Sequence, residues 1–298
     1  MENFFKVRKS CNPGMRHTAV LLVECLDAKG IVASVSSFLY SQGINILSSD
    51  QHQDNEAGLF FMRVEFDLAD FTRELESLAL EFHPIADRFR MHWRLQDTAQ
   101  RARMAIFVSR YQHCLVDLLH RHQIGELRCE IGLILSNHED ARPLADFYQI
   151  PFHHVPVEAT RREEAEALQM RLIERDSIDL IVLARYMQVL SPAFVRRYPL
   201  RIINVHHSFL PAFSGARPYH AAIERGVKLI GATSHYVTEE LDAGPIIEQD
   251  VARISHRDQV EQLIQTGRDL EKVELSRAVL WHLEHRILFY WSKTVVFD

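Results

Sequence analysis

The chain has 298 residues, of which 47% are hydrophobic and 25% are charged. This composition is typical of a globular protein of one or two domains and excludes disordered and fibrous classes. The formal net charge of −6 gives no electrostatic reason to bind nucleic acid or an anionic membrane surface.

The N-terminus and the cysteines indicate a reducing, cytoplasmic setting. Residues 1–14 contain no long apolar stretch behind their basic residues, as a secretory signal would. No apolar run approaches the roughly 20 residues of a membrane span. The four cysteines are scattered and form no CxxC pair, which disfavours structural zinc and a disulfide framework. We therefore expect a cytoplasmic protein with neither a membrane nor nucleic acid among its partners.

Four strands are predicted in the first hundred residues, at 17–25, 44–53, 58–68 and 88–95. In the third of these, apolar residues at positions 60, 62, 64 and 66 alternate with a second set at 61, 63, 65 and 67. Alternation with a period of two is expected for a sheet that has one covered face.

Two helices are predicted between these strands. One begins near Ile31 and is stopped by Gly43. The other has Asp70 as a candidate N-cap and runs to about His83. Its packing side chains are expected to be Phe71, Leu75, Leu78 and Leu80. The order β-α-β-β-α-β is the ferredoxin-like arrangement, which we assign to a first domain over residues 17–96.

A polar linker at 96–103 is followed by strands that alternate with longer helices. Apolar runs of strand length are found at 104–109, 130–136, 178–184, 201–205, 227–237 and 244–254. Helices are expected around residues 115–119, over 161–176 and from about 256 to 285. Such a pattern favours an α/β, Rossmann-like domain with a mostly parallel sheet covered on both faces, here over residues 103–298.

Three loops at strand ends, after 178–184, 201–205 and 227–237, are the expected ligand-binding positions in such a sheet. Asn204 and His206 are two residues apart, so both point to the same side of an extended chain. Asp242 precedes an Ala-Gly pair and suits a tight turn. Each of these residues alone has an ordinary structural interpretation. Together, an amide, an imidazole and a carboxylate suit attack on an acyl carbon, because the oxyanion needs donors and the attacking group needs a base.

The segments N-V-H-H-S-F-L-P (204–211) and G-A-T-S-H-Y-V-T-E-E-L-D-A-G-P-I-I (231–247) resemble the signature of folate-dependent formyltransferases and of their hydrolytic relatives, the formyltetrahydrofolate deformylases. The resemblance extends over about residues 103–285. It implies that Asn204, His206 and Asp242 are catalytic and that His235 is a further active-site histidine.

Several substrate-binding residues are also implied by the resemblance. The stretch L-A-R-Y-M-Q-V-L-S-P (183–192) resembles the loop that lines the folate pterin pocket in this family. The residues that would hold the pterin edge through backbone groups are Tyr186, Met187, Gln188 and Val189. We add His207 and Ser208, which occupy a position where transferases commonly have Pro-Ser. His207 either helps to hold water or only shapes its loop.

The N-terminal segment C-L-D-A-K-G-I-V-A (25–33), followed by G-I-N-I (43–46), resembles an ACT domain. ACT domains are small regulatory folds that often bind amino acids where two copies meet. An ACT domain ahead of a formyltransferase-like domain is the arrangement of the deformylases. The resemblance therefore implies a homo-oligomer and makes an amino acid a candidate effector.

The turn at 109–114, S-R-Y-Q-H-C, bears on the acceptor of the formyl group. Glycinamide ribonucleotide formyltransferase has a glycine-rich turn here, which cradles the phosphate of its acceptor. The turn in this chain has no glycine, so backbone N–H groups have no open nest for an anion. Water remains as the acceptor. We expect hydrolysis of 10-formyltetrahydrofolate to formate and tetrahydrofolate, which regulates the one-carbon pool and supplies formate for purine biosynthesis, without a metal or cofactor.

Three other functions remain open at this point. The first is formyl transfer to an amine such as an aminoacyl-tRNA or a sugar nucleotide. The second is a metal hydrolase that uses His206, His235 and Asp242, whose residue types suit zinc although their spacing matches no short motif. The third is an amino-acid and folate sensor without catalytic activity.

Overall fold

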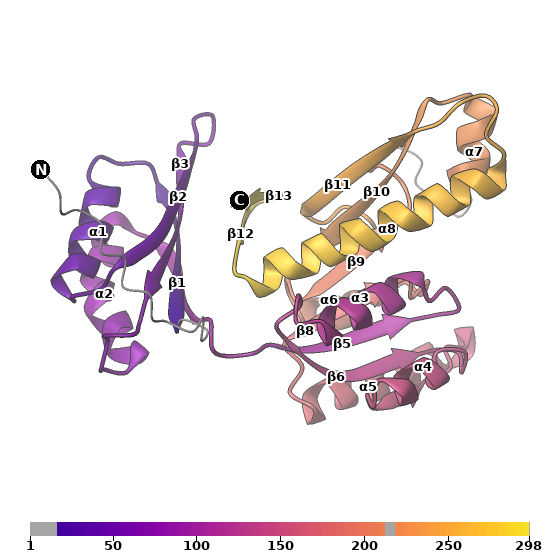
Figure 1. The fold of residues 1–298 in the computed structure, drawn as a ribbon, viewed down its shortest axis with the longest axis horizontal. Helices are drawn as coiled ribbons and strands as arrows, with labels where there is room; N and C mark the ends of the chain where they lie inside the picture. The colour runs from indigo at the N-terminus through magenta and orange to yellow at the C-terminus, as the bar shows by residue number, and fades with distance from the viewer. Residues whose placement is uncertain (1–16, 212–217, 298) are drawn as a thin grey trace, which may run out of the picture. The chain divides into compact units, whose positions relative to one another are not determined.

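The computed structural model describes residues 17–211 and 218–297 (Figure 1). Residues 1–16, to which the prediction about a secretory signal applies, lie outside this range. The chain forms two compact units, and the boundary along the sequence falls between Gln100 and Arg101, inside the predicted linker. Among the described residues, no helix combines the length and apolar character needed to cross a membrane.

The N-terminal unit is a four-stranded antiparallel sheet with two helices. In chain order the elements are β1 (Thr18–Leu26), α1 (Ile31–Ser41), β2 (Ile46–Asp54), β3 (Leu59–Asp67), α2 (Leu75–Phe89) and β4 (His92–Asp97). The strands are ordered β2-β3-β1-β4, and every neighbouring pair is antiparallel. The predicted ferredoxin-like order of elements is confirmed.

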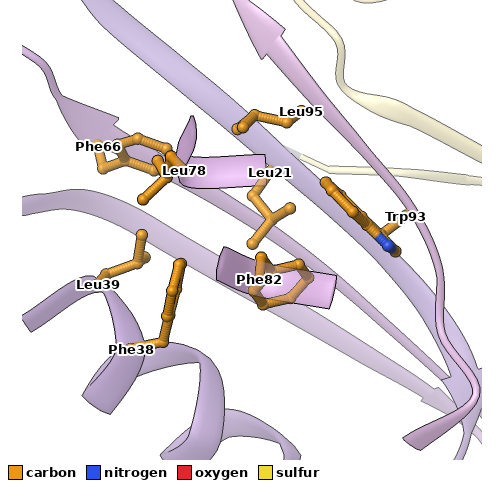
Figure 2. A pocket seen from close by; sticks show the side chains of 8 residues that line it. All are labelled: Leu21, Phe38, Leu39, Phe66, Leu78, Phe82, Trp93 and Leu95. Atoms are coloured by element: carbon orange, nitrogen blue, oxygen red, sulfur yellow. The ribbon is translucent and has the colours of Figure 1, made fainter. Parts of the chain in front are cut away.

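Both helices pack on one face of this sheet, and the predicted alternation in β3 explains why. Its buried side chains on that face are Phe60, Met62, Val64 and Phe66. Figure 2 shows part of this core, with Phe38 of α1 and Phe82 of α2 against Leu21 of β1 and Trp93 of β4. The remaining cavity is apolar and measures about 10 Å³, roughly the space of one water molecule.

The expectation of a single covered face is wrong at two positions. Phe61 and Arg63 point to the opposite face and are nevertheless buried. Phe61 stacks on His52 of β2 with ring centroids 6.2 Å apart. Arg63 donates to Glu65 at 3.0 Å on its own strand. Packing therefore occurs on both sides of β3, and the Arg63–Glu65 ion pair lies on the side opposite the helices.

The predicted bounds of the second helix are wrong at both ends. Asp70 does not cap it, because the chain first makes a separate turn in which Asp67 accepts a hydrogen bond from the N–H of Ala69. The helix begins at Leu75 and continues through Pro84 to Phe89. Proline leaves the carbonyl four residues earlier without its helical partner, and here that residue is the exposed Leu80, whose carbonyl can bind water.

The exposure of Leu80 is itself a correction, since this side chain was expected to pack. The buried face of α2 consists of Leu78, Phe82 and Ala86, which are four residues apart. Leu80 lies two residues from Leu78 and therefore projects away from that face. The predicted strand at 88–95 is also shortened, because α2 occupies its first positions and β4 begins at His92.

The C-terminal unit contains a seven-stranded sheet and a separate hairpin. Its strands are β5 (Arg103–Val108), β6 (Glu130–Ser136), β7 (Phe152–His154), β8 (Leu180–Ala184), β9 (Ile202–His206), β10 (Leu229–Tyr236), β11 (Ile246–Arg253), β12 (Ile287–Tyr290) and β13 (Lys293–Val296). Its helices are α3 (His113–Gln123), α4 (Arg142–Phe147), α5 (Arg162–Arg175), α6 (Pro192–Arg197), α7 (Pro218–Arg225) and α8 (Val260–Leu283), with a 3-10 turn at Ala159–Arg161. The short elements β7, α4, α6 and α7 and the β12–β13 hairpin were not predicted, because each is too brief to show a clear period.

The order of the large sheet is β11-β10-β9-β8-β5-β6-β7. The five strands from β9 to β7 are parallel, whereas β10 and β11 are antiparallel. Helices cover both faces: α3, α4 and α8 contribute to one core cluster, and α5 and α6 contribute to the other. Figure 1 shows α8 running alongside β9, β10 and β11. The α/β class and the mostly parallel sheet are confirmed.

From β5 the chain passes to β6, its neighbour on one side in the sheet. The later strand β8 lies beside β5 on its other side. The carboxyl ends of β5 and β8 therefore flank a topological switch point, the usual ligand position in such sheets.

Candidate active site

Two neighbouring strands bring three candidate side chains to one face of the sheet. Asn204 and His206 alternate with Val205 on β9, and His235 of β10 pairs directly with Asn204. Side chains of paired residues share a face, so all three lie together. The Asn204 Nδ2 atom is 3.3 Å from Nε2 of His235. Nδ1 of His235 donates to the carbonyl of Tyr236 at 2.9 Å, which directs Nε2 toward the site.

Asp242 reaches this face by an unexpected route. Because β10 is antiparallel to β9, its end at Tyr236 lies beside Ile203, near the start of β9. The prediction that this loop meets the others at the carboxyl ends of parallel strands is therefore wrong. Instead the loop between β10 and β11 folds back over the sheet. Oδ2 of Asp242 lies 3.2 Å from Nδ1 of His206, and Oδ1 lies 3.7 Å from Nε2 of His235.

The loop that carries Asp242 is tightly closed. Asp242 has a φ of +55°, a left-handed conformation that aspartate tolerates better than most residues. A Cβ atom on Gly244 would lie 1.8 Å from the carbonyl oxygen of Tyr236. Only glycine allows this approach, so the Ala-Gly pair after Asp242 determines where its carboxylate lies.

The electrostatics of the site follow from these contacts. Hydrogen bonds from His206 first, and then from His235, hold the pKa of Asp242 well below its usual value, and they outweigh the opposing effect of burial. Since Asp242 is ionised, it accepts the Nδ1 proton of His206. Nε2 of His206 is buried and has no hydrogen-bond partner within the described parts of the chain. A buried polar atom without a partner is rare, so this atom is a candidate to bond a ligand.

His207 and Ser208 are placed differently from the catalytic candidates. The ring of His207 stacks on that of His206 with centroids 5.0 Å apart. Burial, and then the positive charge of Arg185, lowers the pKa of His207 to about 4, so the ring is neutral at pH 7. Ser208 is buried, and its carbonyl accepts a hydrogen bond of 2.9 Å from Thr233 of β10.

The predicted pterin loop follows β8. Met187 and Val189 are exposed, Gln188 is half-buried, and Tyr186 is buried against Phe107. The carbonyls of Tyr186 and Val189 accept hydrogen bonds from Ser109 and Arg162, so these two backbone groups are already engaged within the chain. For the other two predicted residues, Met187 and Gln188, no hydrogen bond to the backbone carbonyl is found in the described chain.

Sequence reasoning missed the residues of α5 that hold this loop. Gln169 donates to the hydroxyl of Tyr186 at 2.8 Å. Glu166 accepts the N–H of Ser191 at 2.9 Å and also its hydroxyl. Glu166 and Gln169 are buried although they are polar. Their spacing from Arg162, of four and seven residues, places all three on one face of α5. A polar stripe on the buried face of a helix was the signal that could have revealed them.

The ligand set of the alternative metal hydrolase does not converge. Within the described ranges, the one group of three or more His, Cys, Asp or Glu side chains whose ligand atoms all lie within 4.8 Å is His113, Cys114 and Glu271. His206, His235 and Asp242 do not form such a group.

Comparison with known proteins adds a family relationship to this geometry. Residues 102–279 match the formyl transferase family, and residues 19–79 match the ACT domain family. The chain is 52% identical to formyltetrahydrofolate deformylase of Bacillus subtilis (strain 168), over 93% of each chain.

Solved structures give the same relationship. A formyltetrahydrofolate deformylase from Pseudomonas syringae pv. tomato str. DC3000 is 50% identical, with a TM-score of 0.93 and 95% of both chains covered. A phosphoribosylglycinamide formyltransferase from Coxiella burnetii is 29% identical, with a TM-score of 0.61, and covers 66% of this chain and 94% of its own.

Proposed function

The chain belongs to the formyltetrahydrofolate deformylase family, and we propose that Asn204, His206 and Asp242 catalyse its reaction. That reaction is the hydrolysis of 10-formyltetrahydrofolate to tetrahydrofolate and formate. The main support for this assignment is the distance of 3.2 Å between Nδ1 of His206 and Oδ2 of Asp242. Nε2 of His206 is then left buried and without a hydrogen-bond partner within the described chain. This atom and the Asn204 amide lie on one face, beside a carboxylate that can act as a base.

The chemistry begins with water. Asp242 orients a water molecule and accepts its proton, directly or through His206. The water oxygen bonds to the formyl carbon, and the carbonyl oxygen becomes an oxyanion. Nε2 of His206, when protonated, and the amide of Asn204 stabilise that charge. Donors of this kind contribute about 100 to 1,000-fold in rate each.

The second half of the reaction breaks the carbon–nitrogen bond. The electron pair of the oxyanion re-forms the carbonyl, and the folate nitrogen leaves with a proton supplied by the His206–Asp242 pair. Tetrahydrofolate and formate are the products, and one proton is released overall. No metal or cofactor takes part in this proposal.

The folate itself is expected to bind along the loop after β8. Exposed Met187 and half-buried Gln188 would offer it an apolar surface and polar groups, and His207, Ser208 and His235 are the other proposed substrate-binding residues. Buried hydrogen bonds from α5 keep the loop in place.

The direct test is incubation with 10-formyltetrahydrofolate alone. Formate and tetrahydrofolate should appear in a 1:1 ratio without any amine present. Formyl loss that depends on an added amine would contradict hydrolysis. Tight folate binding without turnover would instead favour a sensor.

For the N-terminal unit we propose a regulatory role, supported by its match to the ACT domain family. An amino acid is the proposed effector, bound where two copies of the chain meet in a homo-oligomer. The apolar cavity of about 10 Å³ in the core is too small for it, so the effector would bind at the surface of the unit. The enzyme is proposed to act in the cytoplasm, where it regulates the one-carbon pool and supplies formate for purine biosynthesis.

A further inference from the structure

A row of three side chains crosses the strands β9, β10 and β11 on the catalytic face. Thr233 of β10 pairs with His206 of β9 on one side and with Gln249 of β11 on the other. Paired residues of adjacent strands present their side chains to the same face. Thr233 is completely buried, and Gln249 is half-buried. The mechanism above uses His206 of this row and gives no role to the other two residues.

The hydroxyl of Thr233 holds the loop that follows β9. It donates to the carbonyl of Ser208 at 2.9 Å and accepts the N–H of Leu210 at 3.1 Å. The amide nitrogen of Gln249 donates a third hydrogen bond to the same oxygen at 3.0 Å. A hydroxyl has one donor and two acceptor positions, so all three are used here.

Gln249 also bonds directly to the loop. Its amide nitrogen donates to the carbonyl of Leu210 at 3.0 Å. The N–H and the carbonyl of Leu210 are therefore both bound by this pair of side chains. Leu210 is buried, and a buried backbone group that loses its partner is costly. Thr233 and Gln249 thus supply bonds that this part of the loop needs.

A glycine allows the loop to lie close to β10. Gly231 is two residues before Thr233 and therefore shares its face of the sheet. A Cβ atom on Gly231 would lie 3.0 Å from Cβ of Phe209 and 2.7 Å from the carbonyl oxygen of Asp250. The loop after β9 therefore crosses β10 on the catalytic face, over Gly231 and Thr233.

His207 is held from both ends by this arrangement. Its neighbour His206 lies in β9 and pairs with Thr233. Its other neighbour, Ser208, is bonded to the Thr233 hydroxyl. A residue between two fixed neighbours has little freedom, and the ring of His207 stacks on that of His206 with centroids 5.0 Å apart and planes inclined by 28°. The bonds of Thr233 therefore determine which ring lies against the face of His206.

We infer that Thr233 and Gln249 are positioning residues for the proposed reaction. They hold the loop after β9 and thereby keep the His207 ring against that of His206. This contact leaves His206 one orientation, with Nδ1 toward Asp242 and Nε2 toward the formyl oxygen. The inference rests on the proposed function, in which His206 stabilises the oxyanion. Thr233 and Gln249 take no part in making or breaking bonds and act through the loop.

A merely structural role predicts a different result from a positioning role. Bonds that only stabilise the fold lower the temperature of unfolding, whereas the enzyme that remains folded keeps its kcat. Bonds that orient His206 contribute to the transition state, so their loss lowers kcat of the folded enzyme. KM should change less, because the loop after β8 is the proposed binding position of the folate.

The test compares two substitutions at Thr233. Thr233→Val keeps the shape and removes the hydroxyl, whereas Thr233→Ser keeps the hydroxyl. We expect kcat of folded Thr233→Val to fall at least about tenfold, because small misplacements of reacting groups are costly. KM for 10-formyltetrahydrofolate should change less than about threefold. Thr233→Ser should retain most of kcat. The amide hydrogen of Leu210 should exchange with solvent faster in Thr233→Val than in the unmodified protein or Thr233→Ser.

Two further variants complete the design. Thr18→Val is the matched control, because Thr18 is a buried threonine of the N-terminal unit whose hydroxyl lies 2.8 Å from that of Thr98. It should keep the kcat of the unmodified enzyme, whatever its temperature of unfolding. If Thr233→Val does not fold, Gln249→Met replaces it as the test. This variant removes both hydrogen bonds of the Gln249 amide nitrogen at similar side-chain length, and kcat should fall with little change in KM.

The inference is overturned if folded Thr233→Val, or Gln249→Met in its place, keeps the kcat of the unmodified enzyme. An equal loss of kcat in Thr233→Ser would show that the hydroxyl is not the cause and would overturn it too. So would a Leu210 amide that exchanges in the unmodified protein as fast as in an unfolded chain. Failure of the unmodified enzyme to release formate from 10-formyltetrahydrofolate alone would instead refute the proposed function. Exchange at Leu210 does not depend on activity, so the two failures are distinguishable.

Discussion

The Asp242 carboxylate lies 3.2 Å from Nδ1 of His206, although the chain enters its loop from the opposite end of β9. Tyr236, the last residue of β10, pairs with Ile203, and only the fold-back of the following loop returns Asp242 to His206. The proposed catalytic pair therefore depends on loop geometry as much as on the strands, and this can be tested at Asp242 and at the loop.

Asp242→Asn removes the proposed base while preserving size. We expect turnover to fall by about 100 to 10,000-fold, because a positioned general base contributes that much, with folate binding largely retained. Steady-state kinetics and equilibrium binding of a folate would measure the two effects. Asp146→Asn, an exposed aspartate in α4, is the matched control. Near-normal turnover in Asp242→Asn would remove this residue from the mechanism.

Gly244→Ala tests the loop without touching a catalytic side chain. A Cβ atom at this position would clash with the Tyr236 carbonyl oxygen, so the loop must move and carry Asp242 with it. We expect turnover to fall by at least about tenfold, since small misplacements near the reacting atoms are costly. Gly125→Ala is the control: its Cβ would meet nothing within 4 Å, and its positive φ costs stability only. Equal turnover in the two variants would contradict the role of Gly244.

Glu166→Gln weakens the support of the loop after β8. Glu166 accepts two hydrogen bonds from Ser191, and the neutral amide can replace only part of this interaction. We expect KM for 10-formyltetrahydrofolate to rise severalfold with a smaller change in kcat. The exposed Glu163→Gln on the same helix should leave both constants unchanged. A fall in kcat at unchanged KM would argue against a role in positioning the folate loop.

Glu274 of α8 predicts a pH dependence of stability. Its carboxylate is completely buried, and neither oxygen has a hydrogen-bond partner in the described residues. Burial first, and then Glu248 and Asp250, raises its pKa to about 8. The folded protein therefore holds a proton that the unfolded chain loses above its ordinary value of 4.5. Stability should fall as pH rises from 4.5 toward 8.

The variant Glu274→Gln removes this dependence. The free energy of unfolding, measured with denaturant, should exceed that of the unmodified protein at pH 8 and match it near pH 4.5. Glu261→Gln, an exposed change on the same helix, should shift neither value. A gain that is equal at both pH values would point to packing and would contradict titration of Glu274.

Removal of metal ions should leave activity intact. The mechanism assigns oxyanion stabilisation to Asn204 and His206 and proton transfer to Asp242, with no metal step. Exhaustive chelation followed by elemental analysis and an activity assay would check this. Activity that is lost on chelation and restored by zinc would revive the metal hydrolase and remove the metal-free mechanism.

Periodicity in the sequence determined most of the elements. The alternation in β3 identified its core face, since strand side chains point to opposite sides whatever the partners are. The pair Asn204 and His206 shares a side for the same local reason. Local signals failed where two local structures competed, as at Asp70, where a separate turn ahead of α2 displaced the expected cap.

What only the tertiary structure decided is which distant residues meet. The antiparallel course of β10 cannot be derived from its composition, and it determines how Asp242 reaches His206. Glu271 lies in a helix whose sequence marks it as one more charged residue. Its burial against His113, Arg185 and Tyr219 arises from three other elements. Local propensity depends on neighbours within a few residues, whereas an active site depends on long-range packing that the chain reaches only when all its elements are assembled.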